Sequence, residues 1–168
     1  MAGRTVVIGI GNDCRGDDAA GLEAVRLLAA AVPAHVTVAL SRGDPAGLVE
    51  TWTGAGLAVV VDAAASGAPP GTVHRYRETP AEPGPGLPAR SPPTGTHSAG
   101  LAEAVGLGRV LGRLPRELVV YGIEGADFAV GAAMTPVVAR ATQRVAALVA
   151  GRITSRSPLS LDDPLPPV

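Results

Sequence analysis

Hydrophobic residues along the chain show a pattern typical of strands in some segments and a pattern typical of helices in the segments between them. Short, uninterrupted apolar runs rich in valine and isoleucine predict strands that are buried on both faces of a parallel sheet. A segment in which apolar and polar residues alternate predicts a half-exposed edge strand. The runs predict strands over residues 6–10, 36–40, 57–62 and 117–123, and the alternating segment covers 72–76.

Between these strands, apolar residues recur every three or four positions, which is the spacing of a helix with one buried face. This spacing predicts helices from Asp17 to Pro33, over 45–52, over 98–111 and from Pro136 to about Ala150. We expect Asp17 or Asp18 to cap the first turn of the first helix. Strands that alternate with helices predict an α/β fold, namely a three-layer α/β/α sandwich. The expected sheet is mostly parallel and twisted, with about five strands and with helices on both faces.

Two proline-rich segments interrupt this pattern. Residues 77–96 contain too many prolines and glycines for a helix or a central strand and predict a long surface loop. Residues 154–168 have four prolines and little apolar content, so we expect a disordered C-terminal tail. The sequence shows no internal repeat and no domain boundary, and residues 1–153 are therefore expected to form a single domain.

The composition excludes several functional classes. With 14 basic and 15 acidic side chains, the chain has no positive field to attract nucleic acid or an anionic membrane. One Trp, two Tyr and one Phe are too few for a platform on which bases stack. The single cysteine can form no internal disulfide, the N-terminal apolar run is too short for a signal peptide, and no run approaches the about 20 apolar residues that span a bilayer. We therefore expect a cytoplasmic protein that binds neither nucleic acid nor a membrane.

Polar side chains that could carry chemistry follow the predicted strands. In an open parallel sheet, ligands bind outside the carboxyl ends of the strands. Asp18 lies in the segment after the first strand, Asp62 ends the third strand, and His97 precedes the helix over 98–111. Two carboxylates and one imidazole are thus expected at one edge of the sheet. Such a set of two oxygen ligands and one nitrogen ligand suits a borderline divalent ion such as nickel or zinc, with positions left for water or a substrate atom.

Each of these three residues also has a purely structural interpretation. Asp62 could cap the turn that follows it, Asp18 could stabilise a helix N-terminus, and His97 could be an exposed residue before a helix. The other two histidines, His35 and His74, have no partner nearby in the sequence, and no role is assigned to them.

Two rival sites use the segment after the first strand. Its glycines, at positions 9, 11 and 16, have the spacing GxGxxxxG rather than the GxGxxG of a dinucleotide loop, so they indicate nucleotide binding only weakly. Cys14 could form a thiol triad with His97 and Asp62, but a lone cysteine is more often a small buried hydrophobe.

Three separated motifs of the chain occur together in one known family. They are Gly9-Ile-Gly-Asn12 followed by Asp17-Asp18-Ala-Ala-Gly21, a strand that ends in Asp62, and Thr96-His97-Ser98-x-Gly-Leu101. In order and approximate spacing they resemble the motifs of the hydrogenase maturation proteases. These endopeptidases trim the C-terminus of the large subunit of nickel-iron hydrogenases. The resemblance extends over residues 4–150.

The resemblance implies that Asp18, Asp62 and His97 are the catalytic and metal-contacting residues. Members of the family recognise nickel already inserted in the large-subunit precursor rather than holding a tight catalytic metal of their own, and a divalent ion such as zinc can substitute at the site. Cleavage then removes the C-terminal extension. The expected partner is therefore a nickel-iron hydrogenase large-subunit precursor, and the expected activity is that of a cytoplasmic endopeptidase.

One stretch departs from the family pattern. Many members carry Asp-Gly-Gly-Thr after the second strand, in a region associated with substrate selection, whereas this chain has Ser41-Arg42-Gly43-Asp44-Pro45. If Ala46-Gly47 sets the register of the two stretches, Arg42 replaces the family's Asp. Gly43 and Asp44 are the expected substrate-binding residues. The departure keeps a second hypothesis open, namely a non-catalytic module that senses metal in the hydrogenase precursor, or binds the precursor, without cutting it.

Overall fold

The apolar runs of the sequence form the middle layer of the molecule. In this computed structural model, which describes residues 3–82, 84, 97–155 and 164, they pair as one sheet of five strands. The strands are β1 (Arg4–Ile10), β2 (Thr37–Ser41), β3 (Ala55–Ala64), β4 (Val73–Glu78) and β5 (Glu117–Glu124). Their order is β2-β1-β3-β5-β4, and only β4 runs antiparallel to its neighbour. The prediction of a mostly parallel sheet of about five strands is confirmed.

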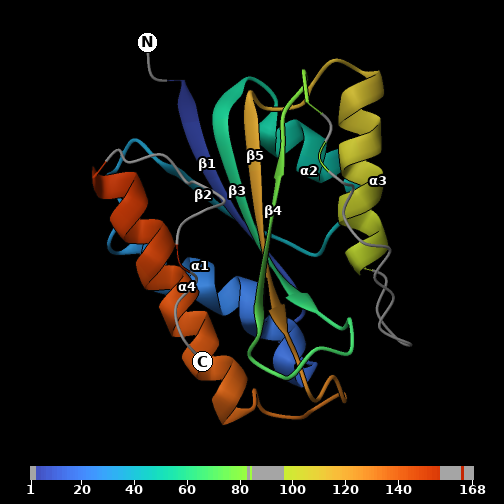
Figure 1. Ribbon diagram of the computed structural model, residues 1–168, viewed down its shortest axis with the longest axis vertical. Helices are drawn as coiled ribbons and strands as arrows, with labels where there is room; N and C mark the ends of the chain where they lie inside the picture. The colour runs from blue at the N-terminus through green and yellow to red at the C-terminus, as the bar shows by residue number, and fades with distance from the viewer. Residues whose placement is uncertain (1–2, 83, 85–96, 156–163, 165–168) are drawn as a thin grey trace.

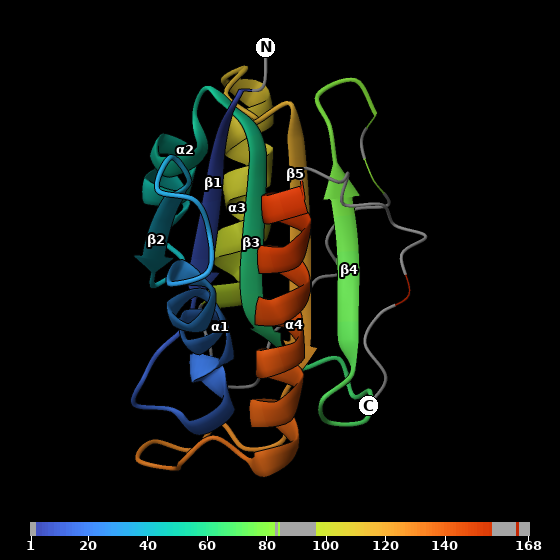
Figure 2. The ribbon, with the colours of Figure 1, turned by 90° about the vertical axis from the view of Figure 1, so that its left-hand side faces the viewer.

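Helices cover both faces of this sheet (Figures 1 and 2). They are α1 (Ala20–Ala29), which follows the 3-10 turn η1 (Gly16–Ala19), α2 (Pro45–Trp52), α3 (His97–Val110) and α4 (Pro136–Ser155). Helices α1 and α4 lie side by side on one face, and α2 and α3 lie side by side on the other. The predicted three-layer α/β/α sandwich is therefore confirmed.

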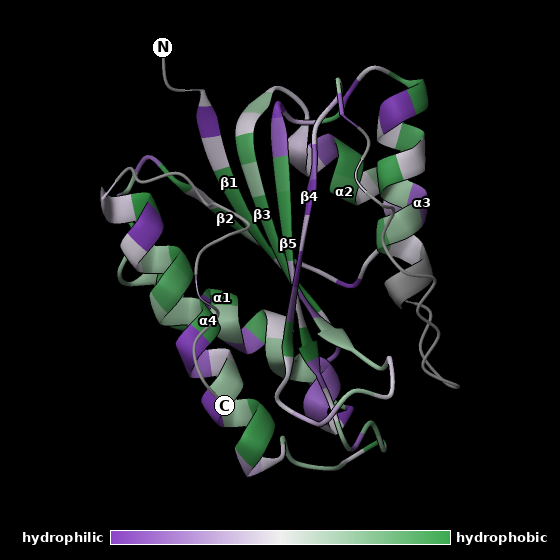
Figure 3. Cartoon of the chain, in the orientation of Figure 1, coloured by the Kyte–Doolittle hydropathy of each residue, from purple (hydrophilic) through white to green (hydrophobic). Residues whose placement is uncertain are grey.

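Each face of the sheet has its own hydrophobic core, because successive side chains of a strand point to opposite faces. In β1, Val7 packs toward α1 and α4, whereas Val6 and Ile8 pack toward α2 and α3. All three side chains are fully buried. Figure 3 shows β1, β3 and β5 as largely hydrophobic strands, while α4 alternates between hydrophobic and hydrophilic residues. Burial on both faces explains why the runs are continuous in the sequence.

The predicted loop over 77–96 begins later than the sequence pattern indicates. Arg77 and Glu78 belong to β4. The Arg77 guanidinium lies 2.9 Å from the Glu117 carboxylate on β5, and the buried Glu78 accepts a hydrogen bond of 2.8 Å from Arg109 on α3. These two ion pairs extend the edge strand into the polar segment. The part of the predicted loop from 85 to 96 lies outside the described residues.

Two helices also end at other positions than predicted. Helix α1 ends at Ala29 and a turn follows, because the residues before Pro33 are disfavoured in a helix. Helix α4 continues past Ala150 to Ser155, since Ile153 still packs against the core of its face. The rest of the predicted tail, apart from residue 164, lies outside the described residues. Of the helices that the structure describes, none combines the length and the apolar character needed to cross a membrane.

The order of the strands reverses between β1 and β3. Strand β1 is flanked by β2 on one side and β3 on the other, so the chain reverses its progress across the sheet at this point. Open α/β sheets bind their ligands outside the carboxyl ends of the two strands at such a reversal. The first turn of α1 closes over these ends through Gly21, which faces the carbonyl oxygens of Ile10 and Val61. A Cβ at Gly21 would overlap both oxygens, so only glycine fits.

The variant Gly21→Ala is expected to lower the free energy of unfolding by about 1–3 kcal/mol, the usual cost of overpacking. Urea titration measures this free energy. The matched control is Gly106→Ala on α3, where the new Cβ has no atom within 4 Å apart from its own helix. This control is expected to gain up to about 1 kcal/mol of helix propensity. Equal effects in the two variants would contradict the close packing of α1 on the sheet.

Candidate functional site

Two of the predicted site residues, Asp18 and Asp62, lie at the carboxyl edge of the sheet. Asp62 is on β3 near its end, and Asp18 is in η1. Each residue is only 6% exposed. The turn η1 is held against the end of β1, because the Asn12 N–H donates to the Asp18 carbonyl oxygen at 3.2 Å and Gly11 packs against the same oxygen. The two carboxylates therefore belong to the ends of the neighbouring strands β1 and β3.

The Asp62 side chain makes a local hydrogen bond. Its Oδ1 accepts from the backbone N–H of Ala63 at 2.8 Å. Because Ala63 is still part of β3, this bond belongs to the strand and not to a turn that follows it. Burying a carboxylate at this depth has a desolvation cost, which hydrogen-bond donors or a cation must offset.

The third predicted residue, His97, is the first residue of α3. One turn further along α3, Gly100 packs against the carbonyl oxygen of Gly43, in the loop after β2. Since β2 is parallel to β1, that loop lies at the same edge of the sheet as Asp18 and Asp62. Helix α3 therefore begins beside the carboxyl edge. The side chain of His97 lies outside the described part of the structure.

The two predicted substrate-binding residues, Gly43 and Asp44, shape the loop after β2. Gly43 is buried with φ 88°, in the region that favours glycine, and its N–H donates to the Ser41 hydroxyl at 2.9 Å. Asp44 is exposed at the N-cap of α2, where its Oδ2 accepts from the Gly47 N–H at 2.7 Å. The loop therefore holds its conformation through its own hydrogen bonds.

Asp17 does not cap the first helix, so the prediction that Asp17 or Asp18 caps its first turn is wrong. The N-cap positions of η1 and α1 carry no side-chain capping bond. Asp17 is instead fully buried, and its Oδ2 accepts hydrogen bonds from the N–H groups of Ala126 and Asp127 at 2.8 and 3.0 Å. Its Oδ1 accepts from the N–H of Thr135 at 2.7 Å and from the hydroxyl of the same residue at 3.0 Å.

These bonds fasten the loop between β5 and α4 to η1. The backbone adds to them, because the Asp17 N–H donates to the Asp127 carbonyl oxygen and the Gly131 N–H donates to the Cys14 carbonyl oxygen, both at 2.8 Å. Asp18 directly follows Asp17 in the chain. The buried carboxylate of Asp17 therefore fixes the backbone that carries Asp18.

A second buried carboxylate, that of Glu124 at the end of β5, fastens the loop after β3. Glu124 is 1% exposed and accepts hydrogen bonds from the Ser66 N–H at 2.6 Å, the Ser66 hydroxyl at 2.9 Å and the Gly67 N–H at 2.9 Å. His74 Nε2 lies 3.1 Å from Glu124 Oε2, so His74, to which the sequence assigned no role, is a partner of this group. Burial raises the pKa of Glu124, but the hydrogen bonds from Ser66, Gly67 and His74 outweigh it and hold the pKa below its ordinary value.

The segment from Gly9 to Gly16 is explained by packing. Each of its three glycines faces a backbone carbonyl oxygen of the same chain: that of Gly21 for Gly9, that of Asp18 for Gly11 and that of Asp127 for Gly16. The glycines thus let backbone segments approach one another. Cys14 is exposed, so its interpretation as a small buried hydrophobe is wrong.

The described side chains include two of the three predicted metal-contacting residues. Within that set, no three His, Cys, Asp or Glu residues lie close enough together to hold a metal ion. The set contains Asp18 and Asp62 but not the side chain of His97. The combination of all three as metal ligands therefore stays a prediction.

Comparisons with known proteins identify the fold. No family model matches the sequence, and no curated protein matches it. Among solved structures, the hydrogenase maturating endopeptidase HybD from E. coli superimposes with a TM-score of 0.76 at 23% identity, over 92% of this chain and 94% of that chain. A solution structure of an endopeptidase from Escherichia coli gives a TM-score of 0.75 at 24% identity, over 90% of this chain and 93% of that chain. The NiFe hydrogenase maturation protease HycI from Thermococcus kodakarensis KOD1 gives 0.63 at 22% identity, over 90% and 92%.

These matches cover nearly the whole of each solved structure. The chain therefore has the fold of the hydrogenase maturation endopeptidases, and the fold that the sequence resemblance implied is confirmed.

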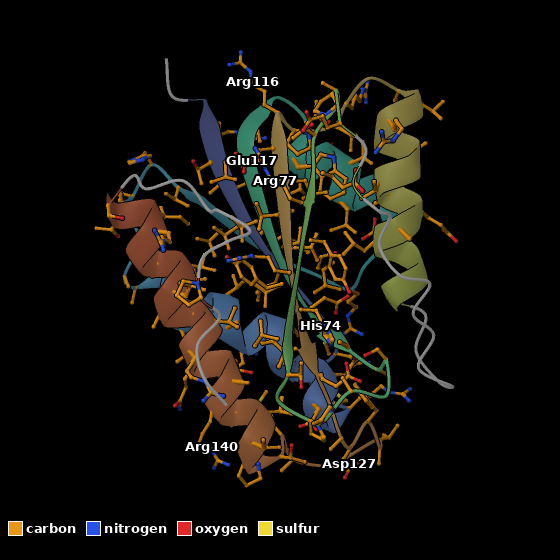
Figure 4. The ribbon with its side chains drawn as sticks, in the orientation of Figure 1. His74, Arg77, Arg116, Glu117, Asp127 and Arg140 are labelled. Carbon is orange, nitrogen blue, oxygen red and sulfur yellow. The ribbon has the colours of Figure 1, made fainter. Side chains whose placement is uncertain are left out.

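The variant Asp17→Asn is expected to lower the free energy of unfolding by about 2–4 kcal/mol, because an amide nitrogen would replace one acceptor and face backbone N–H groups that stay buried. Urea titration at neutral pH measures the change. The control is Asp127→Asn in the same loop, whose exposed carboxylate is at the carboxyl edge in Figure 4 and accepts only a local bond from Ala129. We expect this control to stay within about 0.5 kcal/mol of the parent. A change of less than about 0.5 kcal/mol in Asp17→Asn would show that these hydrogen bonds do not hold the loop.

The stabilising effect of Glu124 is expected to disappear at acid pH. Because its pKa is lowered on folding, its contribution is present above the ordinary pKa of 4.5 and is lost as the pH falls through the lower folded value. The free energies of unfolding of the parent and of Glu124→Gln, measured between about pH 6 and pH 3, should therefore converge toward the acid end. A gap that stays constant over this range would show that the carboxylate charge is not what holds the loop.

Proposed function

We propose that this protein is an endopeptidase that removes the C-terminal extension from the nickel-loaded precursor of a nickel-iron hydrogenase large subunit. The observation that carries this proposal is the pair of nearly buried carboxylates, Asp18 and Asp62, at the ends of β1 and β3. The fold shared with solved hydrogenase maturation endopeptidases supports it. In this proposal the precursor is the partner and the reaction takes place in the cytoplasm.

The nickel ion enters the site as part of the substrate. Asp18 and Asp62 supply oxygen ligands and His97 supplies a nitrogen ligand, a set that suits nickel and that zinc could also occupy. Two carboxylates both attract a cation that lies near them, so the arrival of the nickel ion stabilises the site. These three residues thereby distinguish a loaded precursor from one without nickel.

The same arrangement supports hydrolysis of the peptide bond that lies next to the nickel. Polarisation of the scissile carbonyl by the substrate's cation favours attack of water at the carbonyl carbon. A carboxylate of the site accepts the proton of the attacking water, the C–N bond breaks, and the leaving amine takes up a proton. In this proposal the loop that contains Gly43 and Asp44, beside the start of α3, contacts the extension.

The test is the intact mass of a large-subunit precursor, with and without nickel, before and after incubation with the protein. We expect nickel-dependent loss of one defined C-terminal peptide. His97→Ala and Asp62→Asn should each lower the cleavage rate by about 100-fold or more, since each removes a ligand of the cation. The matched control is Glu50→Gln on α2, an exposed carboxylate outside the site, which should cleave at the parent rate.

Each other result has a definite meaning. Cleavage by His97→Ala at the parent rate would refute the assignment of the site. A stable complex with the nickel-loaded precursor, without release of a peptide, would favour the non-catalytic, metal-sensing module. Cleavage that does not depend on nickel would refute the recognition of the metal.

A further inference from the structure

His74 and Asp62 lie in one row across the sheet. Asp62 of β3 pairs with Gly122 of β5, and Gly122 pairs with His74 of β4. Residues opposite each other on paired strands point to the same face of a sheet. In β4 that face is identified by Tyr76, two positions from His74, which packs toward α2 and α3. The side chains of Asp62 and His74 therefore both belong to the face of the sheet that α3 covers.

The separation of these two residues suits a reaction centre. They are two strand spacings apart, so their Cα atoms are separated by about 10 Å. Gly122, on the strand between them, has no side chain. A cation on the Asp62 carboxylate, the carbonyl group that it polarises and a hydrogen bond to the nitrogen of the same peptide bond together span about 8–10 Å. His74 therefore lies at the distance at which the nitrogen of the cut bond is expected.

A buried carboxylate holds the imidazole ring of His74 (Figure 4). Its Nε2 lies 3.1 Å from Oε2 of Glu124, and 24% of the His74 side chain is exposed. Hydrogen bonds from Ser66 and Gly67 stabilise the negative charge of Glu124. An anion beside an imidazole stabilises the positive charge of the ring when it is protonated. Among the described residues, the hydrogen bonds of the ring are on Nε2, so Nδ1 is the nitrogen that can face a substrate.

The hydrolysis described above requires two separate proton transfers. A carboxylate of the nickel site takes a proton from the attacking water, on the carbonyl side of the peptide bond. The amide nitrogen must gain a proton as the C–N bond breaks, because an unprotonated amide nitrogen is a very poor leaving group. A proton donor on the far side of the peptide bond from the nickel site meets this need.

We propose that His74 is the general acid of the cleavage reaction and that Glu124 positions it. The Nδ1–H of the protonated imidazole gives its proton to the amide nitrogen as the C–N bond breaks. The attacking water supplies the hydroxyl group of the new carboxyl terminus, and its other proton passes through the site carboxylate to solvent. The neutral ring then takes a proton from solvent. This inference rests on the proposed endopeptidase function and adds the proton donor of its reaction.

The first experiment compares kcat and KM for cleavage of the nickel-loaded precursor by the parent and by His74→Ala. We expect kcat to fall by about 100-fold and KM to change by less than about twofold, because a general acid acts in the transition state. The matched control is His35→Ala. His35 is an exposed histidine in the turn before β2, at the opposite, amino edge of the sheet, and the control should keep both parental values.

Chemical rescue separates proton donation from a structural role. His74→Ala is assayed with added imidazole and with added pyrazole, a ring of the same shape that is not protonated near neutral pH. Imidazole should raise the kcat of the variant by about tenfold, whereas pyrazole should not. Neither ring should raise the kcat of the parent. Rescue by imidazole also shows that the variant is folded.

A double-mutant cycle tests the role of Glu124. Glu124→Gln should lower kcat by about tenfold when His74 is present and should change it little in the His74→Ala background, because Glu124 acts through the ring. A purely structural effect on the loop after β3 would lower kcat equally in both backgrounds, and that result would overturn the positioning role.

Three results would overturn the general acid while the proposed function stands. They are a kcat of His74→Ala within about twofold of the parent value, a loss that appears in KM alone, and no more rescue by imidazole than by pyrazole. Failure of the parent to cleave any nickel-loaded precursor would overturn both proposals.

Discussion

The hydrogen bonds between the buried Asp17 carboxylate and the loop after β5 hold the carboxyl edge of the sheet in shape. A fully buried carboxylate is tolerated only where several donors replace its water, and backbone N–H groups of Ala126, Asp127 and Thr135 do so here. Because the donors and the acceptor come from segments more than a hundred positions apart, η1 and this loop depend on each other for their final conformation. The position of Asp18, the next residue in η1, depends on these hydrogen bonds.

Glu124 holds the loop after β3 in the same way as Asp17 holds the loop after β5. Asp17 and Glu124 each accept backbone N–H groups from a distant loop, which stabilises their charge without a cation. Asp62 accepts a hydrogen bond from the backbone N–H of Ala63, within its own strand. Asp18 and Asp62 lie at the ends of neighbouring strands, and two carboxylates at one edge of the sheet favour a positive charge there.

The sequence predicts most of the fold because its strongest signals are local. Strands that are buried on both faces require continuous apolar runs, and Pro45, at an early position, predicts the start of α2. The roles of the residues at the site are harder to predict from the sequence. Asp17 and Asp18 are neighbouring residues of the same type, and only the tertiary partners of Asp17 show that its role is structural. The partner of His74 lies on another strand, and the exposure of Cys14 depends on the direction of a loop, so neither can be read from spacing.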